Sequence, residues 1–147
     1  MGIDIDMEWK DKTEEEQKEK ELAIFRAGQE SVEALLARRG NDPGVGRTAL
    51  GHVGYLYEPY HGGPYAAVIL LPEVTGPQVR VAKVPAAVMR SRLQEAMASC
   101  RQRAKTLYGD ETGAWGDAMA KSFSDFVDLA ERKEVETGEM VTITASL

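Results

Sequence analysis

The sequence predicts an α+β fold: one mixed, mainly antiparallel sheet of four to five strands with about three helices packed on one face. Apolar and polar residues alternate strictly at both ends of the chain, which is typical of strands with one buried and one solvated face. Three long segments repeat apolar residues at helical spacing. Glycine and proline separate short strand-like runs in the middle. The 147 residues, 43% hydrophobic and 29% charged, suit a single globular domain, 1–147.

The first predicted elements are a strand and a long helix. Apolar and acidic residues alternate over residues 3–8, which predicts the strand. Thr13 and Glu16 have the spacing of a capping box, so the helix is expected to begin after Thr13 and to end before Gly40. Its first turns are charged, and its apolar stripe starts only at Leu22. We therefore expect the amino-terminal end of this helix to project into solvent.

Three strand-like runs are expected after a loop over residues 41–46. The first two, 52–57 and 65–71, are joined by a Gly- and Pro-containing turn. Because residues 65–71 include no charged side chain and are apolar on both faces, they are predicted to form a central strand whose middle is almost fully buried. The third run, 79–84, contains basic residues, which favours the edge of the sheet.

Two helices and a strand complete the predicted order β-α-β-β-β-α-α-β. The first helix is expected between Pro85 and Gly109, with Cys100 on its apolar stripe and Arg103 among the basic residues of its exposed surface. The second helix starts near residue 115 and stops before Gly138. Alternation over residues 140–147 predicts the closing strand.

The chain is acidic overall but positive in its middle. Its net charge is −6, whereas residues 41–108 carry 8 Lys and Arg against 4 Asp and Glu, a net charge of +4. This asymmetry predicts attraction of an anionic small molecule or an acidic protein patch, unless ordinary salt bridges neutralise the basic residues. It argues against duplex nucleic acid as a partner, because that requires a larger basic surface.

Cysteine content and hydropathy indicate the cellular compartment in which the protein is expected. A single cysteine allows no internal disulfide and favours a reducing environment. Residues 1–9 lack the features of a signal peptide, and the longest apolar run, 65–72, is too short to span a bilayer. We therefore expect a cytoplasmic protein with no membrane partner, and the sequence leaves a homo-oligomer open.

Residues 51–65 are the candidate site. They contain both histidines and four of the five tyrosines, next to glycines and prolines that permit close backbone approach. Rings and imidazoles in such a segment suit ligand contact better than core filling. The predicted ligand-binding residues are Tyr55, Tyr57, Tyr60, His61, Gly62, Gly63 and Tyr65, together with Arg47 from the preceding loop.

Catalysis is the alternative use of this segment. His61 or His52 could act as a general base with Glu58 orienting the imidazole. A strand of roughly 17–20 Å would separate the two histidines, so a shared metal ion is not expected, and no cofactor motif is present. A simple hairpin loop with an idle, exposed His61 also stays open.

The sequence favours a non-catalytic binding or regulatory module that recognises a small anionic or aromatic ligand, or a partner protein, through residues 51–65. The alternative is a small hydrolase or transferase that uses a histidine general base. We prefer binding because no nucleophile, metal cluster or cofactor loop accompanies the histidines. Residues 1–5 and 60–65 resemble those of small bacterial or phage proteins, and this resemblance implies no activity.

Overall fold

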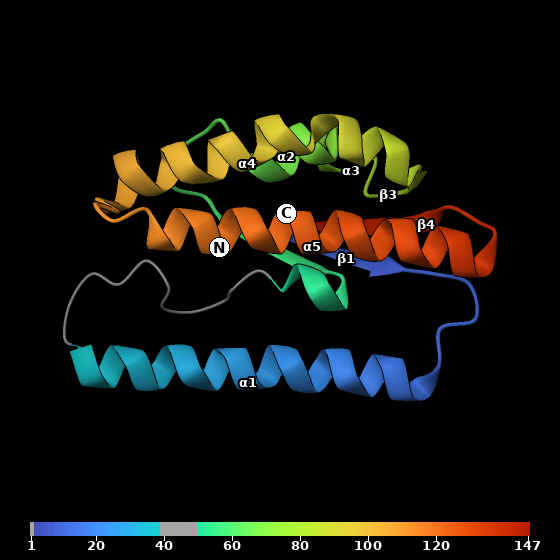
Figure 1. Cartoon of the computed structure of the whole chain (residues 1–147), viewed down its shortest axis with the longest axis horizontal. Helices are drawn as coiled ribbons and strands as arrows, with labels where there is room; N and C mark the ends of the chain where they lie inside the picture. Colours follow the sequence, from blue (N-terminus) through green and yellow to red (C-terminus); the bar gives the residue numbers. More distant parts are fainter. Residues whose placement is uncertain (1, 39–49) are drawn as a thin grey trace.

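The computed structural model describes residues 2–38 and 50–147, which form a four-stranded antiparallel sheet and its helices (Figure 1). The predicted α+β class is therefore confirmed. In chain order the elements are β1 (Gly2–Glu8), α1 (Glu14–Arg38), the 3-10 turn η1 (Gly51–Val53), β2 (Tyr55–Pro59), α2 (Ala66–Leu70), α3 (Pro72–Thr75), β3 (Val81–Val84), α4 (Ala86–Tyr108), α5 (Ala114–Thr137) and β4 (Val141–Ser146).

The two ends of the chain form the centre of the sheet. The strand order is β2-β1-β4-β3, and every neighbouring pair is antiparallel. In this register Ile5 lies between Leu56 and Ala145, and all three side chains are buried on the inner face. The alternation predicted for both terminal strands is thus confirmed, and so is the edge position of the third predicted run, now β3.

The long helices α4 and α5 cover the inner face of the sheet. Figure 1 shows them side by side, with α2 next to α4 and with β1 and β4 behind α5. Phe123 and Phe126 of α5 are fully buried in the core. The turn η1 lies directly on α5: the amide of Gly51 donates to Ser122 Oγ at 2.8 Å, and a Cβ at Gly51 would come within 1.6 Å of the Ser122 carbonyl oxygen. Only glycine permits this approach.

The helix boundaries predicted from glycines are confirmed where the structure describes them. Gly109 and Gly138 adopt left-handed φ values of 63° and 74° directly after α4 and α5. The predicted stop at Gly40 lies outside the described residues. None of the helices in the described parts of the chain combines the length and the apolar character needed to cross a bilayer.

The predicted central strand over residues 65–71 is wrong. Residues 66–70 form α2 instead, in which Leu70 is fully buried, Ile69 is partly buried and Val68 is 38% exposed. A short apolar run lacks the periodicity that distinguishes a buried strand from a buried helix. Tertiary contacts favour the helix over the strand here. The Glu58 carboxylate accepts hydrogen bonds from the first amides of α2, and β1 and β4 already occupy the sheet centre. The run predicted over 52–57 also shifts, to η1 followed by β2.

The expectation that the start of α1 projects into solvent is also wrong. The capping box forms, with Thr13 N donating to Glu16 Oε1 and Glu16 N donating to Thr13 Oγ1, both at 3.1 Å. The first turns are then tied to the body: the Lys20 ammonium lies 2.6 Å from Asp6 and is almost fully buried. Further along α1, the apolar Phe25 is instead 62% exposed.

The helical assignment of residues 66–70 can be tested by its burial pattern. We expect Leu70→Ala to lower the free energy of unfolding by about 2–5 kcal/mol, because it leaves a cavity in the core. The neighbouring exposed position gives the control, with a cost below about 1 kcal/mol for Val68→Ala. Denaturant unfolding measures both changes. Equal costs at the two positions would contradict the helix, since a central strand buries both side chains.

The capping box provides a second test, at the start of α1. Thr13→Ala should cost about 1 kcal/mol, because the amide of Glu16 loses its acceptor. Glu15, which is exposed and outside the box, should tolerate replacement by Ala within about 0.5 kcal/mol. Thermal unfolding of the two variants checks the difference, and similar melting temperatures would show that the cap does not contribute.

Candidate binding surface

A buried ion pair joins β2 to α4 at the base of the candidate segment. Glu58 is 0% exposed and Arg103 is 4% exposed, and the Arg103 guanidinium donates to Glu58 Oε2. Glu58 also accepts hydrogen bonds from the amides of Ala66 at 3.0 Å and Ala67 at 2.8 Å. Burial raises the pKa of Glu58 above its usual range, and the two amides and Arg103 offset part of this effect.

Arg103 also fixes the turn that follows β2. Its Nε donates to the carbonyl of Gly62 at 2.8 Å, and its Nη2 donates to the carbonyl of Pro59 at 3.1 Å. The guanidinium carbon lies 4.8 Å from the centre of the Tyr65 ring, which is within range of a cation–π contact. One buried side chain therefore holds the beginning, the middle and the end of this turn.

Two further features keep the turn on α4. Ser99 Oγ donates to the carbonyl of Pro64 at 2.7 Å. Gly62 has a φ of 118°, a value that side chains other than hydrogen rarely allow. Residues 60–64 are nevertheless exposed to solvent. The structure thus presents a turn that is exposed on its outer side and anchored on its inner side.

The anchored turn places its rings against the end of α4 and the start of α5. The His61 ring packs edge-on against Tyr108 with centroids 5.4 Å apart, and Tyr108 packs edge-on against Trp115 at 4.7 Å. Tyr60 is 39% exposed and meets Tyr65 edge-on at 5.8 Å. We define the aromatic surface as Tyr60, His61, Leu107, Tyr108 and Trp115; Leu107 is 40% exposed and borders Gly62.

The polar chemistry of this surface is a neutral phenol and an imidazole. Burial raises the pKa of Tyr108, so its phenol stays protonated at neutral pH. The phenol oxygen is hydrogen-bonded to His61 Nδ1. Glu58, the predicted partner of this histidine, accepts its hydrogen bonds from the amides of Ala66 and Ala67 and from Arg103 instead. The structure therefore brings His61 together with Tyr108, and not with Glu58.

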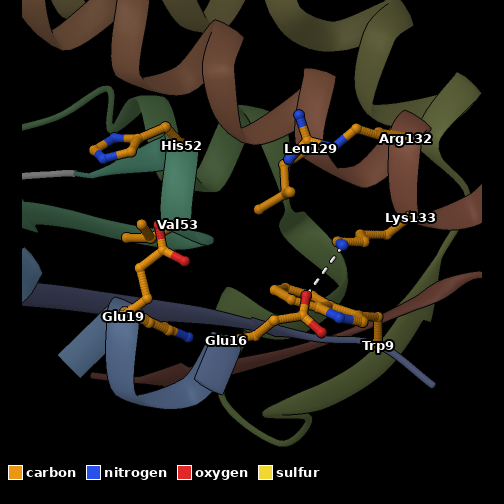
Figure 2. Close-up of a pocket in the computed structure, with 9 residues that line it drawn as sticks. Trp9, Glu16, Glu19, His52, Val53, Leu129, Arg132 and Lys133 are labelled. Atoms are coloured by element: carbon orange, nitrogen blue, oxygen red, sulfur yellow. Dashed lines mark hydrogen bonds and ion pairs between the residues drawn. The ribbon is translucent and has the colours of Figure 1, made fainter. Parts of the chain in front are cut away.

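The remaining predicted residues are divided between two other places. Tyr55 and Tyr57 lie on the outer face of β2, and the Tyr55 hydroxyl donates to Asp4 Oδ1 at 2.5 Å. His52 belongs to η1, where it lines a pocket of about 120 Å³ against α1 and α5 (Figure 2). Arg47 lies outside the described residues. The predicted segment thus contributes to three separate regions of the molecule.

Sequence reasoning missed the residue that organises the surface. Arg103 was predicted to be exposed, and this is wrong, because it is one of the buried side chains of α4. Arg103 lies three residues after Cys100 and four before Leu107, and this spacing places it on the apolar stripe of the helix, which indicates burial. Tyr108 and Trp115 lie outside residues 51–65, so only the fold shows that they join His61.

Other chemistry receives no support from the described residues. Cys100 is buried, and burial raises its pKa to about 12, so it stays a neutral thiol at neutral pH. Within residues 2–38 and 50–147, no three His, Cys, Asp or Glu side chains are grouped as metal ligands. Comparison of the chain with protein-family models, curated protein sequences and solved structures finds no match. Function must therefore be argued from the site itself.

The anchoring role of Arg103 can be tested by unfolding. Arg103→Met should lower the free energy of unfolding by about 3–5 kcal/mol, because it leaves the Glu58 carboxylate buried without its cation. Arg101 lies on the same helix but pairs with Asp117 on the surface, so Arg101→Met should cost less than about 1 kcal/mol. Equal losses in chemical denaturation would contradict the proposed difference between the two arginines.

Proposed function

We propose that this protein is a binding module that recognises a partner protein through the aromatic surface. The observation that carries this proposal is the set of contacts from Arg103, which fasten an exposed turn to α4. The buried guanidinium thus fixes the conformation in which the turn exposes Tyr60 and His61. The proposal keeps the binding function expected from residues 51–65 and narrows it to the part of the segment around Tyr60 and His61.

Preorganisation makes this surface suitable for recognition. Binding costs less conformational entropy when the contact residues are already ordered, and Arg103, Ser99 and Gly62 order this turn before any partner arrives. Tyrosine and tryptophan are enriched among the residues that dominate binding energy at protein interfaces. Tyr60 and Tyr108 combine an apolar ring with a hydroxyl that can bond to a partner backbone.

The rings, rather than charge, are the basis of the proposed recognition. The positive middle of the sequence suggested an anionic ligand, but most of its arginines have acidic partners within the chain. The pairs are Arg90 with Asp128 and Glu131, Arg92 with Glu73, Arg101 with Asp117, and Arg103 with Glu58. These contacts support the alternative that the basic residues serve internal salt bridges, and they favour an aromatic or apolar contact with the partner.

A reducing compartment is the expected setting of this interaction. The buried thiol of Cys100 has no disulfide partner, which suits the cytoplasm. The proposal includes the regulatory role expected from the sequence, in which the protein would act by binding its partner.

A peptide selection tests the proposed surface directly. Peptides from a random displayed library are selected on the immobilised protein and then measured against Tyr60→Ala and His61→Ala. Both variants should keep the wild-type fold by circular dichroism, because these side chains are exposed. They should weaken binding about tenfold or more, as interface tyrosines do when truncated.

The control for this experiment is Val135→Ala. Val135 is 86% exposed on the last turns of α5, away from the aromatic surface, and its replacement should leave peptide affinity unchanged. If the selected peptides bind the Tyr60 and His61 variants as tightly as the wild type, the aromatic surface is not the binding site. Unfolding of His61→Ala would instead show that the imidazole has a structural role through Tyr108.

A further inference from the structure

A second site lies on the other side of α5, where α1, η1 and α5 meet around a pocket of about 120 Å³ (Figure 2). Trp9, Val53 and Leu129 give it an apolar lining. Its polar lining comes from three elements: α1 contributes Glu16, Glu19 and Lys20, whereas α5 contributes Arg132 and Lys133, and η1 contributes His52. In Figure 2 the two glutamates lie along the lower side of the pocket, and Arg132 and His52 lie along its upper side.

Part of this charge is already used inside the protein. The Lys20 ammonium is 2.6 Å from Asp6, and the Lys133 ammonium bridges Glu16 at 3.1 Å and Glu136 at 3.0 Å. These contacts fasten α1 to the sheet and to α5. The groups that they involve have little capacity left for a ligand.

The other polar groups of the pocket lack such partners among the described residues. Within residues 2–38 and 50–147, the side chains of Glu19 and His52 make no hydrogen bond or ion pair. Among the residues that the structure describes, Arg132 pairs only with Glu136, whose carboxylate oxygen lies 4.0 Å from Nε, and the Arg132 side chain is 61% exposed. The pocket is therefore lined by a carboxylate from α1, a guanidinium from α5 and an imidazole from η1.

We propose that this pocket binds a small zwitterion of the amino-acid type. Its ammonium group would pair with Glu19, its carboxylate would pair with Arg132, and its short carbon chain would lie against Trp9. Charge-assisted hydrogen bonds at both ends would provide the affinity. This site is separate from the aromatic surface, and the inference does not depend on the proposed function.

Simple ions match the pocket less well. An anion alone would be attracted by Arg132 but repelled by Glu19. An alkylammonium ion would be attracted by Glu19 but repelled by Arg132. The volume of about 120 Å³ is well below that of pockets for drug-sized ligands, which suits a molecule of only a few carbon atoms.

The test follows the indole N–H signal of Trp9 by NMR. The chain has two tryptophans, and Trp9→Phe identifies which signal belongs to the pocket. Glycine, β-alanine and 4-aminobutyrate are titrated against acetate, propionate and ethylammonium at constant ionic strength. At least one amino acid should shift the Trp9 signal saturably and bind at least about tenfold more tightly than any ion with a single charge.

Two variants separate the two ends of the ligand. Glu19→Gln should weaken amino-acid binding about tenfold and should not weaken the carboxylates, because it removes the charge that repels them. Arg132→Gln should weaken both the amino acids and the carboxylates. Glu15→Gln is the matched control, because Glu15 lies one turn earlier on α1, is exposed and does not line the pocket. This variant should bind like the wild type.

Three results would overturn the proposal. The first is a Trp9 signal that no amino acid moves up to about 100 mM, which is about a hundred times a millimolar dissociation constant. The second is equal binding of the amino acids and the ions with a single charge. The third is a Glu19→Gln variant that binds as tightly as Glu15→Gln. None of these results bears on peptide binding at Tyr60 and His61, so the two proposals are tested independently.

Discussion

The buried ion pair between Arg103 and Glu58 is the constraint on which the middle of the molecule depends. Burying two charges costs several kcal/mol each unless their hydrogen-bonding capacity is satisfied. Here the carboxylate accepts from the guanidinium and from the amides of Ala66 and Ala67, and the guanidinium also binds the carbonyls of Pro59 and Gly62. Two side chains thus connect β2, α2, α4 and the exposed turn.

A different kind of contact holds α1. Its start is fastened to the body by ion pairs such as Lys20 with Asp6 and Lys133 with Glu16, whereas the sheet and α5 are joined by buried apolar packing. Ion pairs that are partly open to solvent contribute little to stability, so the α1 junction is expected to open more readily than the core. The proposed zwitterion pocket lies at this junction, where a ligand would add contacts between α1 and α5.

Part of the candidate site could be predicted and part could not. Tyr60, His61 and the glycines after them stand together in the sequence, and their composition is enough to mark an exposed contact segment. Arg103, Tyr108 and Trp115 lie 40 or more residues further along, and their approach to His61 depends on how α4 and α5 are placed. Distance along the chain carries no information about such contacts, so only the assembled fold reveals the surface and separates Tyr55 and Tyr57 from it.

The sequence alone determined the elements whose pattern is local. Alternation defines β1 and β4, the capping box starts α1, and Gly109 and Gly138 end the last two helices, because backbone geometry and side-chain periodicity act within a few residues. Tertiary structure decided the state of residues 65–71. Their uniform apolarity suits a buried strand and a buried helix equally, and the carboxylate of Glu58 selects the helix by capping its first amides. It also decided that Arg103 is buried, since a charged side chain enters the core only where partners from other elements surround it.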